Sequence, residues 1–286
     1  MAESDGWRAE PSARQTGICH VFSAYGHAET RTFFDNLLPE GGARLSAVDG
    51  HGRQFDNNDN IAGLLSVLGG ECPGAVMVVP EDAPPPKFPG DLSRDYGPLT
   101  DGEVERMLMD VSAGRMPGEL ERSSLPGVQA KLALARLDGD GRFLRPAMKG
   151  VPTTHLLKVA PRGDPKFHGT VANETLCMRV AETAGLPVAD ARRISFDRLD
   201  ALLVRRYDRV VSADGLVTRL HQEDAAQALG LDRTLKYEAK ARQANRGAGL
   251  ADLIGPFAAL TAVPEIRGAI GAAVDDDDVS AEEVRP

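Results

Sequence analysis

The hydrophobic and polar positions of the first hundred residues predict a small helical unit followed by a proline-rich segment. FFDNLLPEGG, from residue 33, combines an apolar helical turn with a Pro-Glu-Gly-Gly stop, and IAGLLSVLGG, from residue 61, has helical spacing and a Gly-Gly stop. The short β-branched run GAVMVVP, residues 74–80, predicts a buried strand. Residues 80–98 contain six prolines, whose fixed φ angles and missing donors predict a linker without regular structure.

A helix is predicted directly after this linker. The run T-D-G-E places Thr100 at the N-cap and Glu103 three positions later, which is the pattern of a capping box. Val104, Met107 and Leu108 follow at helical spacing and supply an apolar face.

The chain from residue 124 to residue 230 alternates strand patterns with helices. Two strands are predicted on either side of an Asp-Gly-Asp-Gly turn at residues 138–141, and THLLKVA, residues 154–160, predicts a third. VANETLCMRVAETAG predicts an amphipathic helix that ends with Gly185 at the C′ position. Residues 192–209 predict two further strands, and residues 221–230 predict a helix.

This element order indicates an α+β fold. The second half has the arrangement of a protein-kinase amino-terminal lobe, with an antiparallel sheet, one helix and a hinge. A likeness of architecture does not by itself give a function, so the function has to come from particular residues.

Composition and charge exclude several classes of protein. A chain of 286 residues with 42% hydrophobic and 26% charged residues is long enough for one or two domains with a buried core. The net charge of -9 argues against a general nucleic-acid-binding surface. The three cysteines lie far apart, which predicts a cytoplasmic protein. The polar, acidic start predicts that there is no signal peptide, and the lack of an apolar run of about 20 residues predicts that there is no membrane span.

The first candidate for chemistry is the segment SLPGVQAK, from Ser124 to Lys131. A glycine directly before a strand lets the main chain approach a phosphate closely, and the Ser and Gln side chains add donors. Taken alone, the segment is better explained as a simple turn that enters a strand.

The second candidate is the pair Lys158 and Glu174. A lysine inside an apolar strand is unfavourable to bury without a partner, and Glu174 lies sixteen residues on, in the next predicted helix. The spacing matches the strand-lysine to helix-glutamate pair of protein kinases. Two alternatives remain open: a lysine that reaches solvent at a strand end, and a solvated acid that complements the helix dipole.

Two further segments carry weaker signals. LLVRRYDR, residues 202–209, could act as a hinge whose main chain binds an adenine edge, although a strand leaving the core explains it too. In RLHQED, residues 219–224, we favour Asp224 or Glu223 as a helix cap. His221 has no ligand partner four residues on, so no metal role is expected for it.

Together and in order, these segments resemble the HipA family, the kinase toxins of bacterial toxin–antitoxin pairs. Each matching stretch is weakly specific alone, whereas nine in family order, from about residue 33 to residue 238, are highly specific. The stretches are FFDNLLPEG, LGGECPGAV, SLPGVQAKLAL, PTTHLLKVA, the pair Asn173-Glu174, GLPVADARR, LLVRRYDR, RLHQEDAAQALG and KYE.

The resemblance implies a division of the chain into four parts. Residues 1–32 are unmatched, and residues 33–98 are the remnant of the HipA amino-terminal subdomain with its proline-rich linker. Residues 99–238 are the kinase amino-terminal lobe and the start of the carboxy-terminal lobe. Residues 239–286 are a truncated or aberrant tail.

The resemblance also implies a nucleotide site. The phosphate-binding loop would consist of Pro126, Gly127, Val128, Gln129, Ala130 and Lys131. Lys158 would contact the phosphates, with Glu174 as its ion-pair partner, and Ser124 would be a candidate autophosphorylation site. Arg205, Arg206 and Tyr207 would form the adenine-binding hinge. The family often has an acidic residue at the first hinge position, and we expect Arg205 to be tolerated because such recognition uses mainly main-chain groups.

The activity and partners that the resemblance implies are those of a kinase toxin. The family transfers phosphate from ATP with magnesium to serine or threonine of proteins, aminoacyl-tRNA synthetases among them, which arrests growth and leads to persistence. Its usual partner is a helix-turn-helix antitoxin of the HipB type, which binds operator DNA. We expect no direct DNA binding by the chain alone and no membrane partner.

Two departures from the family change this expectation. The first 32 residues do not resemble the strands with which the family begins. No N-x-D-x-H-x-x-N catalytic loop and no Tyr-Asp metal-binding motif follow Glu238. We therefore expect no catalytic base, no magnesium ligand and no measurable kinase activity from these residues alone. A non-catalytic fragment that binds the antitoxin or another partner, and one half of a split kinase, remain as alternatives.

Overall fold

The structure is a computed structural model that describes residues 27–49, 60–82, 89–139, 141–160, 168–228 and 230–236. The chain divides into two compact units, residues 1–223 and 224–286. The predicted tail, residues 239–286, and most of the predicted unmatched segment, residues 1–32, lie outside the described residues. The boundaries between the four predicted parts stay predictions.

Within the described part of the first unit, the chain starts with the helices α1 (His27–Asn36), α2 (Gly41–Asp49) and α3 (Ile61–Leu68). The helices α1 and α3 confirm the predicted pattern, and Asn60 caps α3 by accepting a hydrogen bond from the Gly63 N–H at 2.8 Å. The helix α2 was not predicted, because its two leading glycines were interpreted as a stop. Gly41 instead starts the helix with a positive φ of 54°.

The segment after α3 is not a strand, so the prediction of a buried strand at residues 74–80 was wrong. The Val78 N–H donates to the Gly69 carbonyl at 2.8 Å, and Val76 and Val78 pack against the hydrophobic cluster of α3. In the part of the chain that the structure describes, no strand pairs with this segment. Its β-branched residues therefore reflect burial against a helix rather than a place in a sheet.

The proline-rich segment is more regular than predicted. Strands β1 (Gly90–Asp91) and β2 (Tyr96–Pro98) both lie within residues 80–98, which were expected to lack regular structure. Strand β2 pairs with β4 (Phe143–Pro146) in an antiparallel register that sets Tyr96 opposite Pro146. Pro98 is tolerated because β2 is the outermost strand, where a missing N–H donor need not disrupt a ladder.

The helix α4 (Asp101–Ser112) confirms the predicted capping box. The Thr100 hydroxyl accepts from the Glu103 N–H at 3.3 Å, and the Glu103 carboxylate accepts from the Thr100 N–H at 2.9 Å. Val104 and Leu108 are completely buried, as the apolar spacing predicted.

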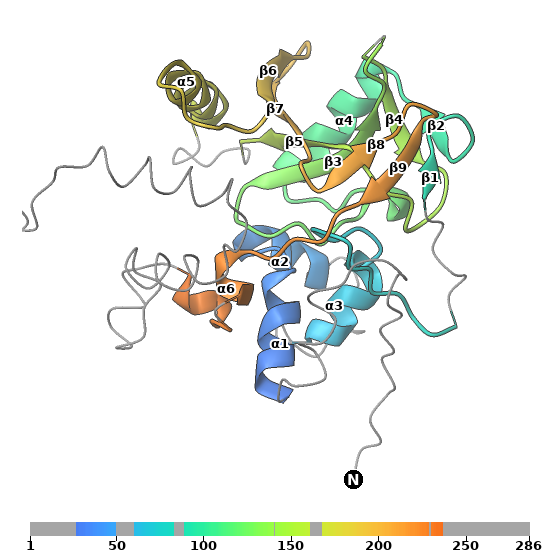
Figure 1. Cartoon of the computed structure of the whole chain (residues 1–286), viewed down its shortest axis with the longest axis vertical. Coiled ribbons are helices and arrows are strands. Elements are labelled where there is room, and N and C mark those ends of the chain that lie inside the picture. The colour runs from blue at the N-terminus through green and yellow to red at the C-terminus, as the bar shows by residue number, and fades with distance from the viewer. Residues whose placement is uncertain are drawn as a thin grey trace, which may run out of the picture. The chain divides into compact units, whose positions relative to one another are not determined.

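An antiparallel sheet of six strands follows in the order β2-β4-β3-β5-β7-β6, which bears out the α+β prediction (Figure 1). The predicted strands correspond to β3 (Ala130–Arg136), β4, β5 (His155–Val159), β6 (Ala191–Ser195) and β7 (Asp200–Arg205). The helix α5 (Thr170–Thr183) contacts β5, β6 and β7, and it ends before Gly185, whose φ of 79° confirms the predicted C′ position.

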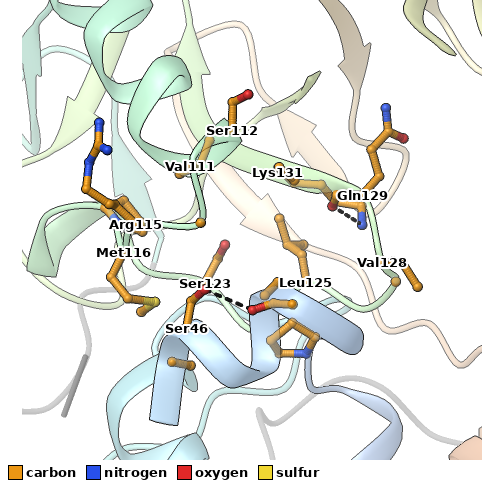
Figure 2. Close-up of a pocket in the computed structure, with 18 of the residues that line it drawn as sticks. Ser46, Val111, Ser112, Arg115, Met116, Ser123, Leu125, Val128, Gln129 and Lys131 are labelled. Carbon is orange, nitrogen blue, oxygen red and sulfur yellow. Dashed lines mark hydrogen bonds between the residues drawn. The ribbon is translucent and has the colours of Figure 1, made fainter. Parts of the chain in front are cut away.

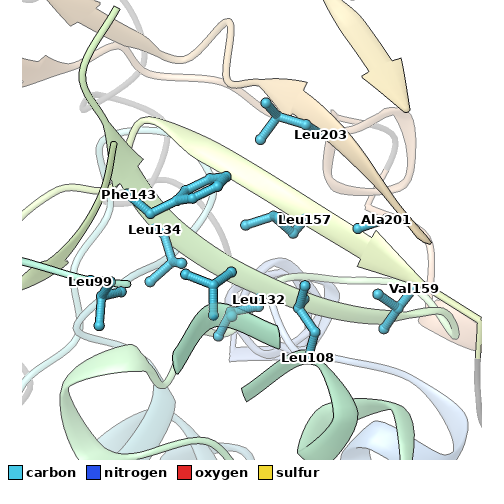
Figure 3. Packing of buried hydrophobic residues seen from close by; sticks show 10 residues of the cluster. Leu99, Leu108, Leu132, Leu134, Phe143, Leu157, Val159, Ala201 and Leu203 are labelled. Atoms are coloured by element: carbon cyan, nitrogen blue, oxygen red, sulfur yellow. The ribbon is translucent and has the colours of Figure 1, made fainter. Parts of the chain in front are cut away.

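The main hydrophobic core lies between α4 and one face of this sheet (Figure 3). Leu108 of α4 packs with side chains from β3, β4, β5 and β7, which are Leu132, Leu134, Phe143, Leu157, Val159, Ala201 and Leu203. The register pairs Lys131 of β3 with Lys158 of β5. Because side chains alternate along a strand, both lysines lie on the sheet face opposite α4.

A second, three-stranded sheet has the order β1-β9-β8, with β8 (Arg209–Val211) and β9 (Leu216–Arg219) joined as a hairpin. This hairpin was not predicted, because its strands are only three and four residues long. Its turn contains Gly215 at a φ of 82°. Its inner face contributes the completely buried Val217 to a cluster with Tyr96, Leu144 and Val151.

The described part of the second unit is short. The helix α6 spans only Ala225–Ala228, so the helix predicted at residues 221–230 was too long. Asp224 caps it as predicted, since its carboxylate accepts from the Gln227 N–H at 2.7 Å. Among the helices that the structure describes, none is long and apolar enough to cross a membrane.

Candidate functional site

The ion pair that the sequence predicted between a strand and a helix is present on the sheet face away from α4. Lys158 of β5 places its Nζ atom 3.2 Å from Oε2 of Glu174 in α5. The two side chains are 25% and 28% exposed. Because the pair stays in contact with solvent, a charged ligand can approach Lys158 without entering a closed core.

The segment predicted to bind phosphate leads directly into β3. Gly127 has a φ of 102°, a conformation that favours glycine, and a Cβ atom there would lie 2.9 Å from the Lys131 Nζ. The Lys131 ammonium donates to the carbonyls of Pro126 at 2.8 Å and Gln129 at 3.1 Å, the second of which is drawn in Figure 2. Lys131 itself lies in β3, and its side chain reaches back to stabilise the main chain of the loop before it.

This loop is also attached to the amino-terminal helices. The Glu40 N–H donates to the Gly127 carbonyl at 3.3 Å, and Pro39 and Gly127 form an isolated parallel bridge. Behind the loop lies a pocket of about 270 Å³, lined by α2, the end of α4 and the loop with Val128 and Leu125 (Figure 2). The loop is therefore one wall of a pocket on the side of the helices.

The candidate autophosphorylation site, Ser124, is completely buried. Its N–H donates to the Glu71 carbonyl at 2.9 Å. The neighbouring Cys72 is buried as well, and burial raises the pKa of its thiol to about 11. A phosphate cannot be added to Ser124 in this conformation, so the segment before the loop would have to move first.

The three predicted hinge residues have different surroundings. The N–H groups of Arg205 and Arg206 donate to the carbonyls of Asp190 at 2.8 Å and Thr154 at 3.0 Å. The Tyr207 side chain is 76% exposed, whereas the Arg206 side chain points into the interior. Adenine recognition by this segment would therefore use groups other than these two N–H donors and the Arg206 side chain.

Arg206 belongs to a buried cluster of charges that the sequence interpretation missed. We call it the Glu71 cluster, and its members are Glu71, Thr153, Arg206, Asp208, Arg209 and Arg219. The Glu71 carboxylate accepts hydrogen bonds from Arg206 Nη1 at 2.5 Å and from Thr153 Oγ1 at 2.8 Å. It also accepts from Arg209 Nη2 at 2.9 Å and from Arg219 Nη2 at 2.5 Å.

A second carboxylate, Asp208, supports part of the same cluster. It accepts from Arg206 Nε at 2.9 Å and Nη2 at 2.8 Å, and it lies 2.9 Å from Arg209 Nη1. Its other main partner is the Gly74 N–H at 2.7 Å. The guanidinium groups of Arg206 and Arg209 also donate to the Cys72 carbonyl at 3.1 and 2.9 Å. The arginines after β7 therefore hold the loop after α3 from several sides.

The pKa values in the cluster follow from burial and opposite charge. Burial alone would raise the pKa of Glu71, but Arg219, Arg209 and Arg206 outweigh it and lower the pKa to about 2. Burial lowers the pKa of Arg209 to about 10 in spite of Glu71. The signal that could have revealed the cluster was a lone glutamate in LGGECPGAV, together with arginines in LLVRRYDR and at the start of RLHQED.

The loop fits the phosphates of a nucleotide. Among the described residues, the N–H groups of Val128 and Gln129 have no hydrogen-bond acceptor, and Gly127 lets the main chain turn sharply beside them. Lys158 supplies a solvent-accessible cation on the sheet next to this loop. Free N–H donors and a lysine are the groups that a triphosphate requires. Within the described ranges no three His, Cys, Asp or Glu side chains gather as a metal site would require.

Each half of the chain matches the model of a known protein family. The family model of the HipA N-terminal domain matches residues 11–79, and that of the HipA-like C-terminal domain matches residues 123–265. The first match begins within the segment that the sequence interpretation left unmatched.

Relatives and a solved structure agree with this assignment. The protein Y4mE of Sinorhizobium fredii is 36% identical over 232 residues, which cover 80% of this chain and 50% of that protein. The serine/threonine-protein kinase toxin HipA of Shewanella oneidensis is 31% identical over 211 residues, or 72% of this chain and 44% of that protein.

The solved complex of Shewanella oneidensis HipA with HipB and operator DNA contains a chain that is 28% identical, with a TM-score of 0.55. The match covers 74% of this chain and 47% of that one. The chain spans about half the length of the curated relatives it matches. Matches to both HipA domain families, in the order and at the places of the motifs, show that the chain belongs to the HipA family.

Proposed function

We propose that this chain carries the nucleotide-binding part of a HipA-type protein serine/threonine kinase. Residues 126–131 would hold the phosphates of ATP, Lys158 would contact them, and Arg205, Arg206 and Tyr207 would border the adenine. The observation that carries the proposal is the Lys158–Glu174 pair at 3.2 Å, on the sheet face next to the loop, in a chain of the HipA family.

Each group has a distinct part in binding the nucleotide. The N–H groups of Val128 and Gln129 would donate to phosphate oxygens, and Lys158 would neutralise their charge. Glu174 would hold the lysine in place, since its carboxylate restrains an otherwise flexible side chain. ATP, together with Mg²⁺, supplies the phosphoryl group that the family transfers.

The protein partners are part of the proposal. A helix-turn-helix antitoxin of the HipB type is the proposed partner, supported by the likeness to the Shewanella oneidensis complex with HipB. The proposed substrate is a serine or threonine of a protein, in line with the name of the related kinase toxin. The proposed location is the cytoplasm.

Nucleotide titration of the full chain tests the proposal. Binding is the suitable readout, because the catalytic motif expected from the family is not among these 286 residues. ATP with Mg²⁺ should bind the wild type, and Lys158→Met should weaken that binding by at least about tenfold, the equivalent of one charge-assisted hydrogen bond.

A matched control is available in the second unit. Lys236 pairs with Asp224 at 3.1 Å and is partly exposed, and none of the residues proposed to bind ATP belongs to this unit. Lys236→Met therefore removes an ion pair outside the proposed set of residues. This variant should bind ATP as the wild type does. A wild type that binds no ATP, or a Lys158→Met variant that binds it equally well, would contradict the proposed function.

A further inference from the structure

We propose that Glu71 is a positioning residue for the segment 205–208, the segment that the proposed function places beside the adenine. Glu71 lies in the loop after α3, 135 residues before Arg206 in the chain. Through three buried arginines, this loop would determine where the segment leaves the sheet. The inference rests on the proposed function only for the identity of the ligand.

Glu71 connects both sides of the turn where β7 ends. One of its oxygens accepts from Arg206 Nη1 and from Thr153 Oγ1, and the neighbouring residue Thr154 accepts the Arg206 N–H at 3.0 Å. The entry to β5 and the exit from β7 are therefore attached to the same carboxylate. A change at Glu71 acts on the segment 205–208 from both strands at once.

The two carboxylates of the cluster are not interchangeable. Asp208 bonds Arg206 and Arg209, so these two arginines keep one acidic partner if Glu71 is neutralised. Arg219 contacts only Glu71 among the carboxylates of the described chain, and its Nε and Nη1 atoms donate no hydrogen bond there. Glu71 thus supplies the negative charge beside Arg219, whose side chain is completely buried and whose Nη2 also donates to the carbonyls of Gly70 and Gly150 at 3.2 Å.

The charges of the cluster show why neutralising Glu71 would displace this segment. Three guanidinium groups share two carboxylates, and all five side chains are nearly inaccessible to water. Without Glu71, Arg206 and Arg209 would keep Asp208 while Arg219 would have no carboxylate partner among the described residues, so the mutual repulsion of the three cations would no longer be balanced. Arg206 and Arg209 flank Asp208 in sequence, and the Leu220 N–H bonds the Asp208 carbonyl at 2.9 Å. The repulsion would therefore act directly on residues 206–209 and on the end of β9.

Amide hydrogen exchange of the full-length Glu71→Gln variant tests the inference without any ligand. The N–H groups of Arg206 and Leu220, which bond Thr154 and Asp208, should exchange at least about tenfold faster than in the wild type. The Val104 N–H, which bonds the Thr100 carbonyl at the start of α4, reports the general loss of stability, and its exchange should accelerate at least about tenfold less than that of these two N–H groups. An equal acceleration at all three sites would show general destabilisation, and unchanged rates at Arg206 and Leu220 would show no positioning; either result overturns the inference.

The chain offers a matched control for this substitution. Glu121 is also a buried glutamate, but it pairs with the single, partly exposed Arg145 at 3.4 Å. Glu121→Gln should leave the exchange of Arg206 and Leu220 unchanged. If it accelerates them as much as Glu71→Gln does, the effect is not specific to Glu71 and the inference is wrong.

A double variant tests the electrostatic reason. Arg219 has no other carboxylate partner within the described ranges, and Glu71→Gln combined with Arg219→Gln removes one negative and one positive charge. It should restore part of the protection that Glu71→Gln loses at Arg206. If the double variant exchanges as fast as the single variant, or faster, unbalanced charge is not the cause.

A comparison of two ligands distinguishes a role of Glu71 in positioning residues 205–208 from a general effect on stability. Glu71→Gln should weaken ATP binding about tenfold and leave the binding of inorganic tripolyphosphate, which has no base, unchanged. Equal losses for both ligands would contradict a role at the adenine segment. If the wild type binds neither ligand, the proposed nucleotide function fails, whereas the exchange pattern still decides whether Glu71 positions residues 205–208.

Discussion

Two ionic sites of the same first unit differ in how much water they meet. The Lys158–Glu174 pair lies on the open face of the sheet with about a quarter of each side chain exposed. In the Glu71 cluster, each carboxylate and guanidinium side chain is at most 6% exposed. Water screens the first site and can be replaced there by a ligand, whereas the second is shielded and strongly coupled.

Exposure to water decides which task a pair of charged residues suits. An exposed pair contributes little to stability and can change partners, which suits a residue that meets phosphate. A buried cluster tolerates no missing partner, which suits a residue that fixes the geometry of a distant segment. In the functions proposed above, similar cations would therefore bind a ligand on one face of the sheet and position a segment inside the fold.

The largest effect should follow from removing the central carboxylate of the buried site. Glu71→Gln is expected to lower the free energy of unfolding by about 3–5 kcal/mol, because it leaves buried arginines uncompensated. Urea unfolding of the full chain, followed by circular dichroism, measures this value. A loss below about 1 kcal/mol, as at an exposed pair, would remove the contrast between the two sites.

Acid should weaken the buried site in a defined window. The pKa of Glu71 is lowered in the folded state from 4.5 to about 2, so its contribution is complete above pH 4.5 and is lost as the pH falls towards 2. The expected loss is ~3 kcal/mol, measured by unfolding at a series of pH values.

The Glu71→Gln variant provides the reference for this titration. It should lack the additional loss of stability between pH 4.5 and 2. His155 reduces the stability of both proteins at higher pH. Burial lowers its pKa from 6.5 to about 4, so stability is lost as the pH falls through that range. Parallel pH profiles of wild type and variant below pH 4.5 would contradict the assignment to Glu71.

An intermediate loss of stability is expected when the N-cap hydrogen bond of α4 is removed. Thr100→Ala removes the N-cap hydroxyl of α4 and should lower the free energy of unfolding by about 1 kcal/mol. Thr100→Ser keeps the hydroxyl and should stay close to the wild type in the same urea experiment. A Ser variant as unstable as the Ala variant would show that the capping hydrogen bond is not the reason.

The smallest effect is expected at the exposed pair. Glu174→Gln should lower the free energy of unfolding by less than about 1 kcal/mol, and the difference from wild type should shrink further in 1 M salt. The measurement is urea unfolding at low and high salt concentration. A loss as large as that of Glu71→Gln would mean that exposure does not separate the two sites.

Features with a local cause could be predicted from the sequence. The capping box at Thr100, the turn at residues 138–141 and the helix end at Gly185 each depend on residues a few positions apart. Lys158 and Glu174 could be paired in advance because they belong to successive elements, sixteen residues apart. Strands β3, β5 and β7 were found because their apolar runs have the length of a buried strand.

Features that depend on distant partners could not be predicted. Arg219 meets Glu71 across 148 residues, and no spacing rule connects two such positions. The segment 74–80 has the composition of a strand, and only the fold shows that it packs on α3 and pairs with none of the described strands. Arg206 was expected to contribute main-chain contacts to a hinge, and its buried side chain became visible only with the three-dimensional arrangement.

The outermost strands of the six-stranded sheet are the places where a strand from another molecule could pair with this sheet. A further strand would have to join at β2, where Pro98 lacks an N–H donor, or at β6, where Arg192 and Arg193 are exposed. At β6, an identical strand from another molecule would bring arginine towards arginine. Fibril-like growth by strand addition is therefore disfavoured at both edges.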